Sequence, residues 1–210
     1  MQSNQTIFKI RDFYRKLTVP QFTIVTGLII IFFGTLILSS PLSSTDKVGI
    51  WEAFFTATSA ITVTGLTIID IGNDLTIFGQ ICLALMLLSG GLGLMAITTF
   101  LQGFVVKGTK LRTRLDKGKT LDEFGVGGIG RTFQSIAITA AIIISLGSII
   151  LYFFGFIDIK DNGERVWAAI FHSISAYNNA GFSLWSSSLY QYRGNLLVNI
   201  VFIFLIILGG

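Results

Sequence analysis

The chain has 210 residues, of which 52% are hydrophobic and only 12% are charged, and its mean hydropathy is +0.75. This composition and its long uncharged runs exclude an ordinary soluble domain and place the chain in a membrane. The single cysteine, Cys82, excludes an internal disulfide bond.

The N-terminal segment, residues 1–17, is polar at first and then carries apolar residues at helical spacing among four basic residues. This pattern is typical of a short helix that lies on the inner membrane surface. A solvated basic tail explains it nearly as well. No apolar core with a cleavage site follows the basic part, so we do not interpret it as a removable signal peptide.

Four uncharged runs predict full membrane spans. The first covers Phe22 to Ser40, the second begins near Ile77, and the third covers Thr132 to Ile157. The fourth begins at Gly194 and stops after 17 residues at Gly210, so we expect the chain to be truncated within its last helix. A loop at 107–131 with seven basic and three acidic residues lies between the second and third spans.

Two shorter segments, around Trp51 to Thr62 and from Glu164 to Tyr177, each provide roughly a dozen residues of helix, which is too few for the roughly 20 needed to cross the hydrocarbon core. A shift of 116 residues aligns them and places Trp51 on Trp167, Ser59 on Ser175 and Gly65 on Gly181. The chain therefore contains an internal repeat. We interpret both segments as re-entrant half-helices that dip into the membrane and return to the same side.

A short motif follows each half-helix. The first is Thr62, Val63, Thr64 and Gly65, and the second is Asn178, Asn179, Ala180 and Gly181. Irregular backbone at membrane depth requires burial in protein or contact with water. Carbonyl oxygens in such a place can replace the hydration shell of an alkali cation, and the negative end of a helix dipole favours a cation. We predict that the eight backbone carbonyls bind potassium, while the side chains of Asn178 and Asn179 brace their loop.

The charge distribution predicts the orientation. The N-terminal segment and the 107–131 loop hold 11 of the 15 basic residues and four of the 11 acidic ones, which marks them as cytoplasmic. Each repeat then crosses the membrane twice, so the two repeats have the same orientation. Parallel repeats can surround an axis along the membrane normal, whereas inverted repeats would favour a rocking carrier.

The segments TATSAITVTGL and HSISAYNNAGF resemble the first two pore regions of the TrkH/TrkG/KtrB superfamily of bacterial potassium transporters, and the KtrB branch is the most similar. The resemblance runs from about Thr18 to the end. It implies the membrane subunit of a potassium uptake system in the bacterial inner membrane, present as a homodimer with a cytoplasmic nucleotide-binding regulatory subunit of KtrA type. Dependence on sodium is also a property of the family. Family members have four such repeats, whereas this chain has two and matches their N-terminal half.

Other motifs carry less weight. Gly125 to Gly130 matches the G-x-G-x-x-G string of nucleotide sites, but no alternation of strands and helices surrounds it, and we expect a flexible entry to the third span. His172 is expected to be packed or hydrogen-bonded. We find no catalytic set, so we predict no enzyme activity, no cofactor and no nucleic-acid binding, with membrane lipid around the spans.

The predicted fold is an all-α membrane protein with two parallel repeats, each a membrane helix, a re-entrant pore helix with its filter loop, and a second membrane helix. The segments are 1–17, the first repeat at 18–106, the basic loop at 107–131 and the second repeat at 132–210. The predicted function is potassium uptake through a channel-like pore. Two alternatives stay open: a secondary carrier for another solute, and a non-conducting fragment or membrane scaffold. Selectivity for potassium over sodium, ion coupling and gating are also open.

Overall fold

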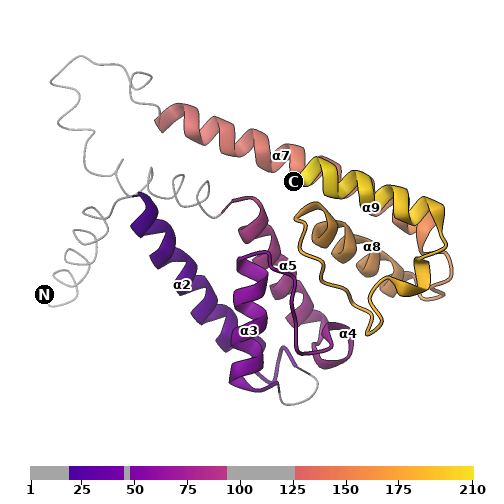
Figure 1. Ribbon diagram of the computed structural model, residues 1–210, viewed down its shortest axis with the longest axis horizontal. Helices are drawn as coiled ribbons and strands as arrows, with labels where there is room; N and C mark the ends of the chain where they lie inside the picture. The colour runs from indigo at the N-terminus through magenta and orange to yellow at the C-terminus, as the bar shows by residue number, and fades with distance from the viewer. Residues whose placement is uncertain (1–18, 45–47, 94–125) are drawn as a thin grey trace, which may run out of the picture. The chain divides into compact units, whose positions relative to one another are not determined.

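The computed structural model describes residues 19–44, 48–93 and 126–210, and its regular structure there is helical, without a strand (Figure 1). The predicted interfacial segment at 1–17 and residues 107–125 of the basic loop lie outside the described residues. The chain divides into one compact unit of residues 1–28 and 93–136 and another of residues 29–92 and 137–210. The first contributes only the beginnings of two helices to the described part.

The described residues of the first half form α2 (Val19–Leu38), α3 (Ile50–Ile61), α4 (Ile71–Asp74) and α5 (Ile77–Gly91) (Figure 1). The second half contains α7 (Val126–Ile150), which continues as the π-helical turn η2 (Leu151–Gly155), and then α8 (Asn162–Tyr177), the 3₁₀ turn η3 (Tyr190–Tyr192) and α9 (Leu196–Gly209). The predicted half-helices thus correspond to α3 and α8, 12 and 16 residues long.

Among the described residues, one helix is long and apolar enough to cross a membrane, at 133–155, with a mean hydropathy of 2.4. It corresponds to the predicted third span. Three shorter apolar helices, Thr23–Leu38, Ile77–Gly91 and Leu196–Gly209, lie within the other predicted spans. Residues 126–130 of the glycine-rich string belong to α7. The structure therefore has a helix where the sequence predicted a flexible segment before the third span. The helix of that apolar span extends further toward the N-terminus than expected.

Polar residues begin three of these helices. The side chains of Thr76, Asp161 and Asn195 accept hydrogen bonds from the backbone N–H groups three residues later, at the starts of α5, α8 and α9. Such N-caps satisfy backbone donors that have no partner within the helix and stabilise it by about 1 kcal/mol. Each cap therefore fixes where its helix begins.

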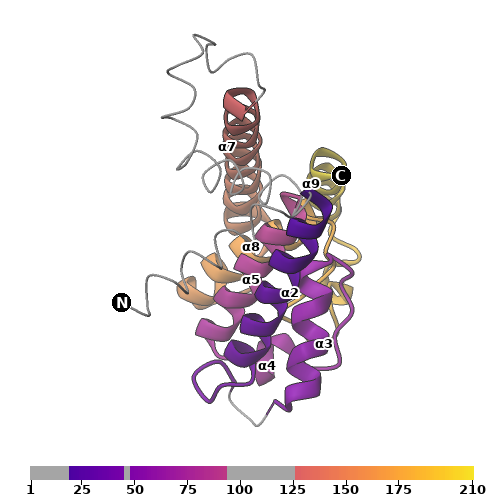
Figure 2. The ribbon, with the colours of Figure 1, turned by 90° about the vertical axis from the view of Figure 1, so that its left-hand side faces the viewer.

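Within the first half, α3 lies beside α5, as the two perpendicular views show (Figures 1 and 2). Gly34 of α2 allows a close approach, because a Cβ atom there would lie 2.6 Å from Cε of Met86 and 3.4 Å from Cβ of Ala57. A small residue thus lets α2 pack on both partners, as is common between membrane helices.

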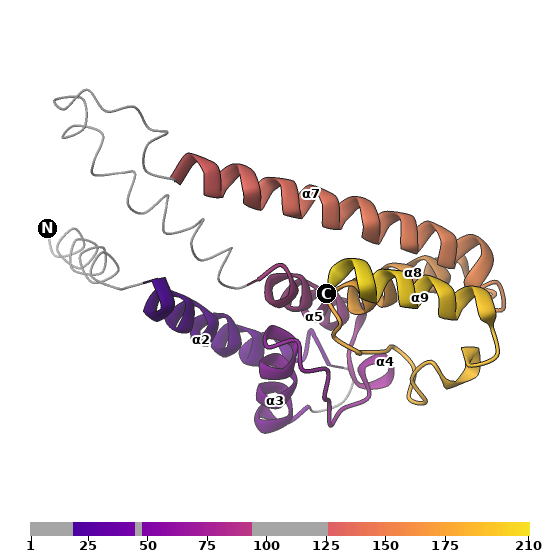
Figure 3. The same ribbon diagram turned by 45° about the horizontal axis from the view of Figure 1, so that its top comes forward.

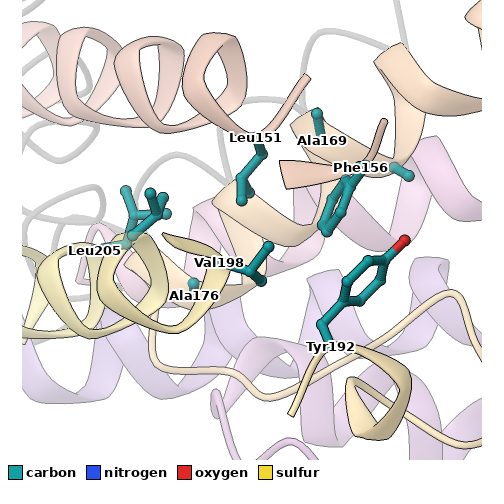
Figure 4. Close-up of a cluster of buried hydrophobic side chains, with 9 residues drawn as sticks. Leu151, Phe156, Ala169, Ala176, Tyr192, Val198 and Leu205 are labelled. Atoms are coloured by element: carbon teal, nitrogen blue, oxygen red, sulfur yellow. The ribbon is translucent and has the colours of Figure 1, made fainter. Parts of the chain in front are cut away.

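Within the second half, α8 lies beside α9 (Figure 3). Their shared core gathers buried side chains from η2, α8, η3 and α9 (Figure 4), namely Leu151, Phe156, Ala168, Ala169, Ala176, Tyr192, Val198, Val201 and Leu205. Burial of this kind contributes about 25 cal/mol per Å² of apolar surface where water is the alternative. The cluster fixes α8, and therefore the motif that follows it.

Candidate functional site

The two motifs follow the C-terminal ends of α3 and α8 with the same hydrogen bonds at positions 116 residues apart. The amides of Val63 and Thr64 donate to Ala60 and Ser59, and those of Asn179 and Ala180 donate to Ala176 and Ser175, over 2.8 to 3.2 Å. Each half-helix therefore ends in a tight turn that leads into extended chain.

The backbone dihedral angles of the motifs also agree. Val63 and Asn179 have φ of 54° and 55°, and Gly65 and Gly181 have φ of 80° and 73°. The left-handed region costs a residue with a Cβ roughly 1 to 2 kcal/mol, whereas glycine adopts it freely. The β-branched Val63 is unusual there, and strain of this type is typical of functional sites.

The motifs lie against each other. A Cβ atom added to Gly65 would lie 1.8 Å from the carbonyl oxygen of Ala180, whereas one added to Gly181 would have nothing within 4 Å. The structure thus brings together the two predicted motifs through Gly65 and Ala180.

The carbonyl oxygens of the eight predicted residues, 62–65 and 178–181, accept no hydrogen bond from any described part of the chain. Their neighbours are engaged: the carbonyls of Thr58, Ser59 and Ala60, and of Ile174, Ser175 and Ala176, all accept amide protons. Thr62, Thr64, Asn179 and Gly181 are exposed, so their carbonyl oxygens are open to water or to an ion. Two runs of acceptors without a partner in the described chain, in contact through Gly65 and Ala180, can bind a dehydrated cation.

The side chains of the second motif bind backbone instead. Nδ2 of Asn178 donates to the Ile174 carbonyl at 2.7 Å, and Nδ2 of Asn179 donates to the Ile206 carbonyl at 3.3 Å. Asn178 is 5% exposed, and a Cβ on Gly91 of α5 would lie 1.8 Å from its Oδ1. Both amides therefore brace the loop, as the sequence predicts.

Serines on the half-helices hold the residue after each glycine. Oγ of Ser59 accepts the N–H of Leu66 at 2.9 Å, whereas Oγ of Ser175 donates to the carbonyl of Phe182 at 2.7 Å. The two serines occupy equivalent positions, but Ser59 binds the backbone N–H of the residue after the glycine, whereas Ser175 binds the backbone carbonyl of that residue.

A pocket of about 350 Å³ adjoins the motifs. Its lining comes from the chain after both of them and includes Thr67, Asp70, Gly181, Phe182 and Ser186. Hydroxyl, carboxylate and backbone groups from both halves therefore meet in one polar space next to the motifs.

Polar contacts join the halves of the chain at two places, where Ser186 meets Asp70 and Asn73 and where Trp167 meets Gln80. Oγ of Ser186 donates to Oδ2 of Asp70, and Nδ2 of Asn73 donates to the same carboxylate oxygen at 3.0 Å. Burial by itself raises the pKa of Asp70, but the hydrogen bonds from Ser186, Asn73 and Gly72 outweigh it and hold the pKa below its usual value. Asp70 is therefore a charged acceptor between the two loops.

The second contact joins helices. Nε1 of Trp167 on α8 donates to Oε1 of Gln80 on α5 at 2.6 Å, while Nε2 of Gln80 donates to the carbonyls of Ile71 and Leu75. Gln80 is 5% exposed. One buried amide thus joins the start of α5 to α8.

The sequence analysis located the motifs but missed these connections. Asp70 and Ser186, and Gln80 and Trp167, lie 116 and 87 residues apart, so no local pattern predicts their pairing. The repeat itself offered one signal, since Trp167 aligns with Trp51. Among the described residues, no group of three or more His, Cys, Asp or Glu side chains could hold a metal ion.

Comparison with known proteins gives a family match over nearly the whole chain. The family model of TrkH, described as a cation transport protein, matches residues 15–210. The Ktr system potassium uptake protein B of Bacillus subtilis is 34% identical over 202 residues, which are 93% of this chain and 44% of that protein. Its namesake in Vibrio alginolyticus is 32% identical over 196 residues, 91% and 42% of the two chains.

A third relative, the potassium/sodium uptake protein NtpJ of Enterococcus hirae, is 32% identical over 210 residues, 98% of this chain and 46% of that protein. The chain therefore spans less than half the length of these curated relatives.

Proposed function

Because this chain belongs to the TrkH family of cation transport proteins, we propose that it takes up potassium through a pore lined by the backbone carbonyls of its two motifs. The carbonyls belong to Thr62, Val63, Thr64 and Gly65, and to Asn178, Asn179, Ala180 and Gly181. The observation that carries the proposal is that these adjacent oxygens accept no hydrogen bond within the described chain. The relatives named for potassium uptake support the choice of ion.

We further propose that α3 and α8 are re-entrant pore helices of two parallel repeats, with both filter loops open to the outside and the N-terminus in the cytoplasm. The equal dihedral angles at positions 116 residues apart support the repeat. The 12-residue length of α3, too short to span a bilayer, supports re-entry. The excess of basic residues in 1–17 and 107–131 supports the orientation.

The link between Trp167 and Gln80 supports a ring of like repeats. Gln80 and Asn199 lie at equivalent positions in α5 and α9. Each lies four residues after the N-cap of its helix, which is Thr76 or Asn195. The side-chain N–H groups of both also donate to backbone carbonyls that precede the helix. Trp51, the counterpart of Trp167, is 81% exposed. We propose that Trp51 and Asn199 make the same link to further pore repeats.

The proposed assembly is a homodimer with a cytoplasmic nucleotide-binding subunit of KtrA type, and sodium dependence is retained as a family expectation. The names of the relatives as proteins of a Ktr system, B and D, support partner subunits. The basic loop at 107–131 is the proposed contact, because its charge suits an acidic cytoplasmic surface or anionic lipid. Neutralising its lysines and arginines should abolish co-purification of such a subunit.

Growth of a potassium-uptake-deficient bacterium on limiting potassium tests the function. The protein, with membrane insertion verified, should restore growth and rubidium uptake. The variants Gly65→Ser and Gly181→Ser should both show reduced growth and uptake while they still insert, and Gly65→Ser should be the more strongly affected. Insertion without uptake above an empty vector, or full uptake by both variants, contradicts the proposed pore.

A further inference from the structure

We propose that His172 is a positioning residue that holds the chain behind the second motif, and that this anchor sets the potassium affinity of the second filter loop. The affinity part rests on the proposed function, whereas the anchoring part does not. The proposal begins from the hydrogen bonds of the imidazole ring, which join α8 to the residues that follow Gly181.

Both ring nitrogens of His172 have backbone or loop partners. Nε2 lies 3.1 Å from Oγ of Ser183 and accepts the backbone N–H of Leu184 at 3.3 Å. Nδ1 lies 2.8 Å from the carbonyl oxygen of Ala168. One side chain therefore ties two successive residues behind the motif to the pore helix.

These partners select one form of the ring. The N–H of Leu184 can only donate, so Nε2 must be the acceptor, and the carbonyl of Ala168 can only accept, so the proton must be on Nδ1. The Ser183 hydroxyl shares the single lone pair of Nε2 with the N–H of Leu184, while its oxygen accepts the N–H of Trp185 at 3.1 Å. Only the neutral imidazole with its proton on Nδ1 provides this acceptor.

The ring is also sealed from solvent. His172 is 1% exposed, it stacks on Trp185 with ring centroids 4.1 Å apart, and the rings of Phe156 and Phe171 contact it edge-on at 5.8 Å. Phenylalanine at this position would fill the space without providing an acceptor, so the part-buried N–H of Leu184 would lose its protein partner. The loss of a hydrogen bond is costly where water has limited access.

The first repeat lacks this anchor. Thr56 occupies the position of His172, is fully buried, and its Oγ1 has no hydrogen-bond partner in the described chain. Thr67, the counterpart of Ser183, donates instead to the carbonyl of Ile69, two residues away. Among the described residues, the loop after the first motif is thus tied to its pore helix through Ser59 alone, whereas the loop after the second is tied through both Ser175 and His172.

The anchor acts close to the proposed filter. His172 and Ser175 lie three residues apart, on one face of α8, and they bind Ser183, Leu184 and the carbonyl of Phe182, the residues directly after Gly181. A side chain that fixes this segment limits the movement of the carbonyls before it. Precise placement of ligands determines ion affinity.

Hydrogen exchange measured by mass spectrometry on the purified protein tests the anchoring. In His172→Phe, amides in peptides that cover 182–185 should exchange at least about tenfold faster, since a buried hydrogen bond is lost. His172→Gln, whose amide oxygen can accept from Leu184, should restore much of the protection. Thr56→Val is the matched control and should leave peptides over 66–70 unchanged. Ser183→Ala provides a second test if His172→Phe does not fold.

The affinity is measured as the rise in melting temperature with added potassium, which requires no transport. His172→Phe should raise the potassium concentration needed for a given rise in melting temperature by about tenfold, as expected for the loss of about one hydrogen bond, and His172→Gln should restore the parent value.

Unchanged exchange in His172→Phe and Ser183→Ala overturns the anchoring. Faster exchange with unchanged potassium affinity overturns the positioning role. If the melting temperature of the parent protein does not rise with added potassium, the proposed function fails. The hydrogen-exchange result still shows whether His172 anchors the loop.

Discussion

Gly65 contacts the carbonyl group of Ala180 so closely that a Cβ atom would lie 1.8 Å from its oxygen and 2.9 Å from its carbon. No real Cβ contact is this short, and the obstacle is backbone, which cannot rotate away. The two proposed filter loops therefore fix each other's position through a residue without a side chain. Gly181 has a similar φ but open space around it. A comparison of the two glycines therefore separates the cost of the left-handed conformation from the cost of the clash with Ala180.

We predict that Gly65→Ala is far more harmful than Gly181→Ala. At Gly181 the methyl group adds only the cost of the left-handed conformation, roughly 1 to 2 kcal/mol. At Gly65 it must also displace Ala180 of the opposite motif. Rubidium uptake at equal membrane levels should fall to background in Gly65→Ala and stay measurable in Gly181→Ala. Equal loss in both variants would show that the close contact is unimportant.

A second prediction concerns Trp167 and Gln80. Trp167→Phe leaves Oε1 of Gln80 buried without its donor, which should cost about 1 to 3 kcal/mol and lower the melting temperature in detergent. Trp51→Phe is the matched control, because the equivalent side chain is 81% exposed, and it should change little. In a double-mutant cycle with Gln80→Leu, additive effects of the two changes would contradict the link.

A third prediction concerns glycines at equivalent places in α5 and α9. A Cβ on Gly90 would lie 2.4 Å from the carbonyl oxygen of Ile61, and one on Gly209 would lie 1.7 Å from that of Tyr177. Each carbonyl belongs to the last residue of a half-helix. Alanine in a free helix would stabilise by about 1 kcal/mol, but Gly90→Ala and Gly209→Ala should both lower thermal stability.

Gly194→Ala is the control for these two changes, since nothing lies within 4 Å of its added Cβ. It should be neutral or slightly stabilising. If Gly90→Ala and Gly209→Ala behave as Gly194→Ala does, α5 and α9 do not depend on close contact with the half-helices.

The fourth prediction is a dependence on pH through Asp70. Its pKa is held below the usual 3.8 by hydrogen bonds from Ser186 and Asn73 against the opposing effect of burial. A depressed folded-state pKa contributes stability that is present above the unfolded pKa and lost as pH falls through the folded value. Melting curves from pH 7 to pH 3 should show a loss that begins near the lower end and is smaller in Asp70→Asn. Parallel curves for the two proteins would refute the role of the carboxylate.

The sequence predicted those elements whose cause is local. The starts and ends of α3 and α8 lie within two residues of the predicted half-helices, because uncharged runs and the motifs after them bound these helices. The brace made by Asn178 also followed from residue chemistry at a helix end. The short α4, begun by Asp70, was missed because four residues have no hydrophobic periodicity.

What the sequence could not reveal depends on contacts between its halves. The pairs Gln80 with Trp167 and Asp70 with Ser186 require the two halves of the chain to pack together, and no local residue pattern encodes that packing. His172 was expected to be packed or hydrogen-bonded, and it is both. Its partners, Ser183 and Leu184, follow only from the path of the chain behind the second motif.

Ser59 accepts a hydrogen bond and Ser175 donates one, so the two positions should accept different substitutions. Ser59 satisfies an N–H group, which has one proton and no second choice, whereas Ser175 satisfies a carbonyl oxygen, which has two lone pairs and is more tolerant of a missing partner. Alanine should therefore be accepted more readily at 175 than at 59. Two identical serines at aligned positions therefore differ in the substitutions that they tolerate.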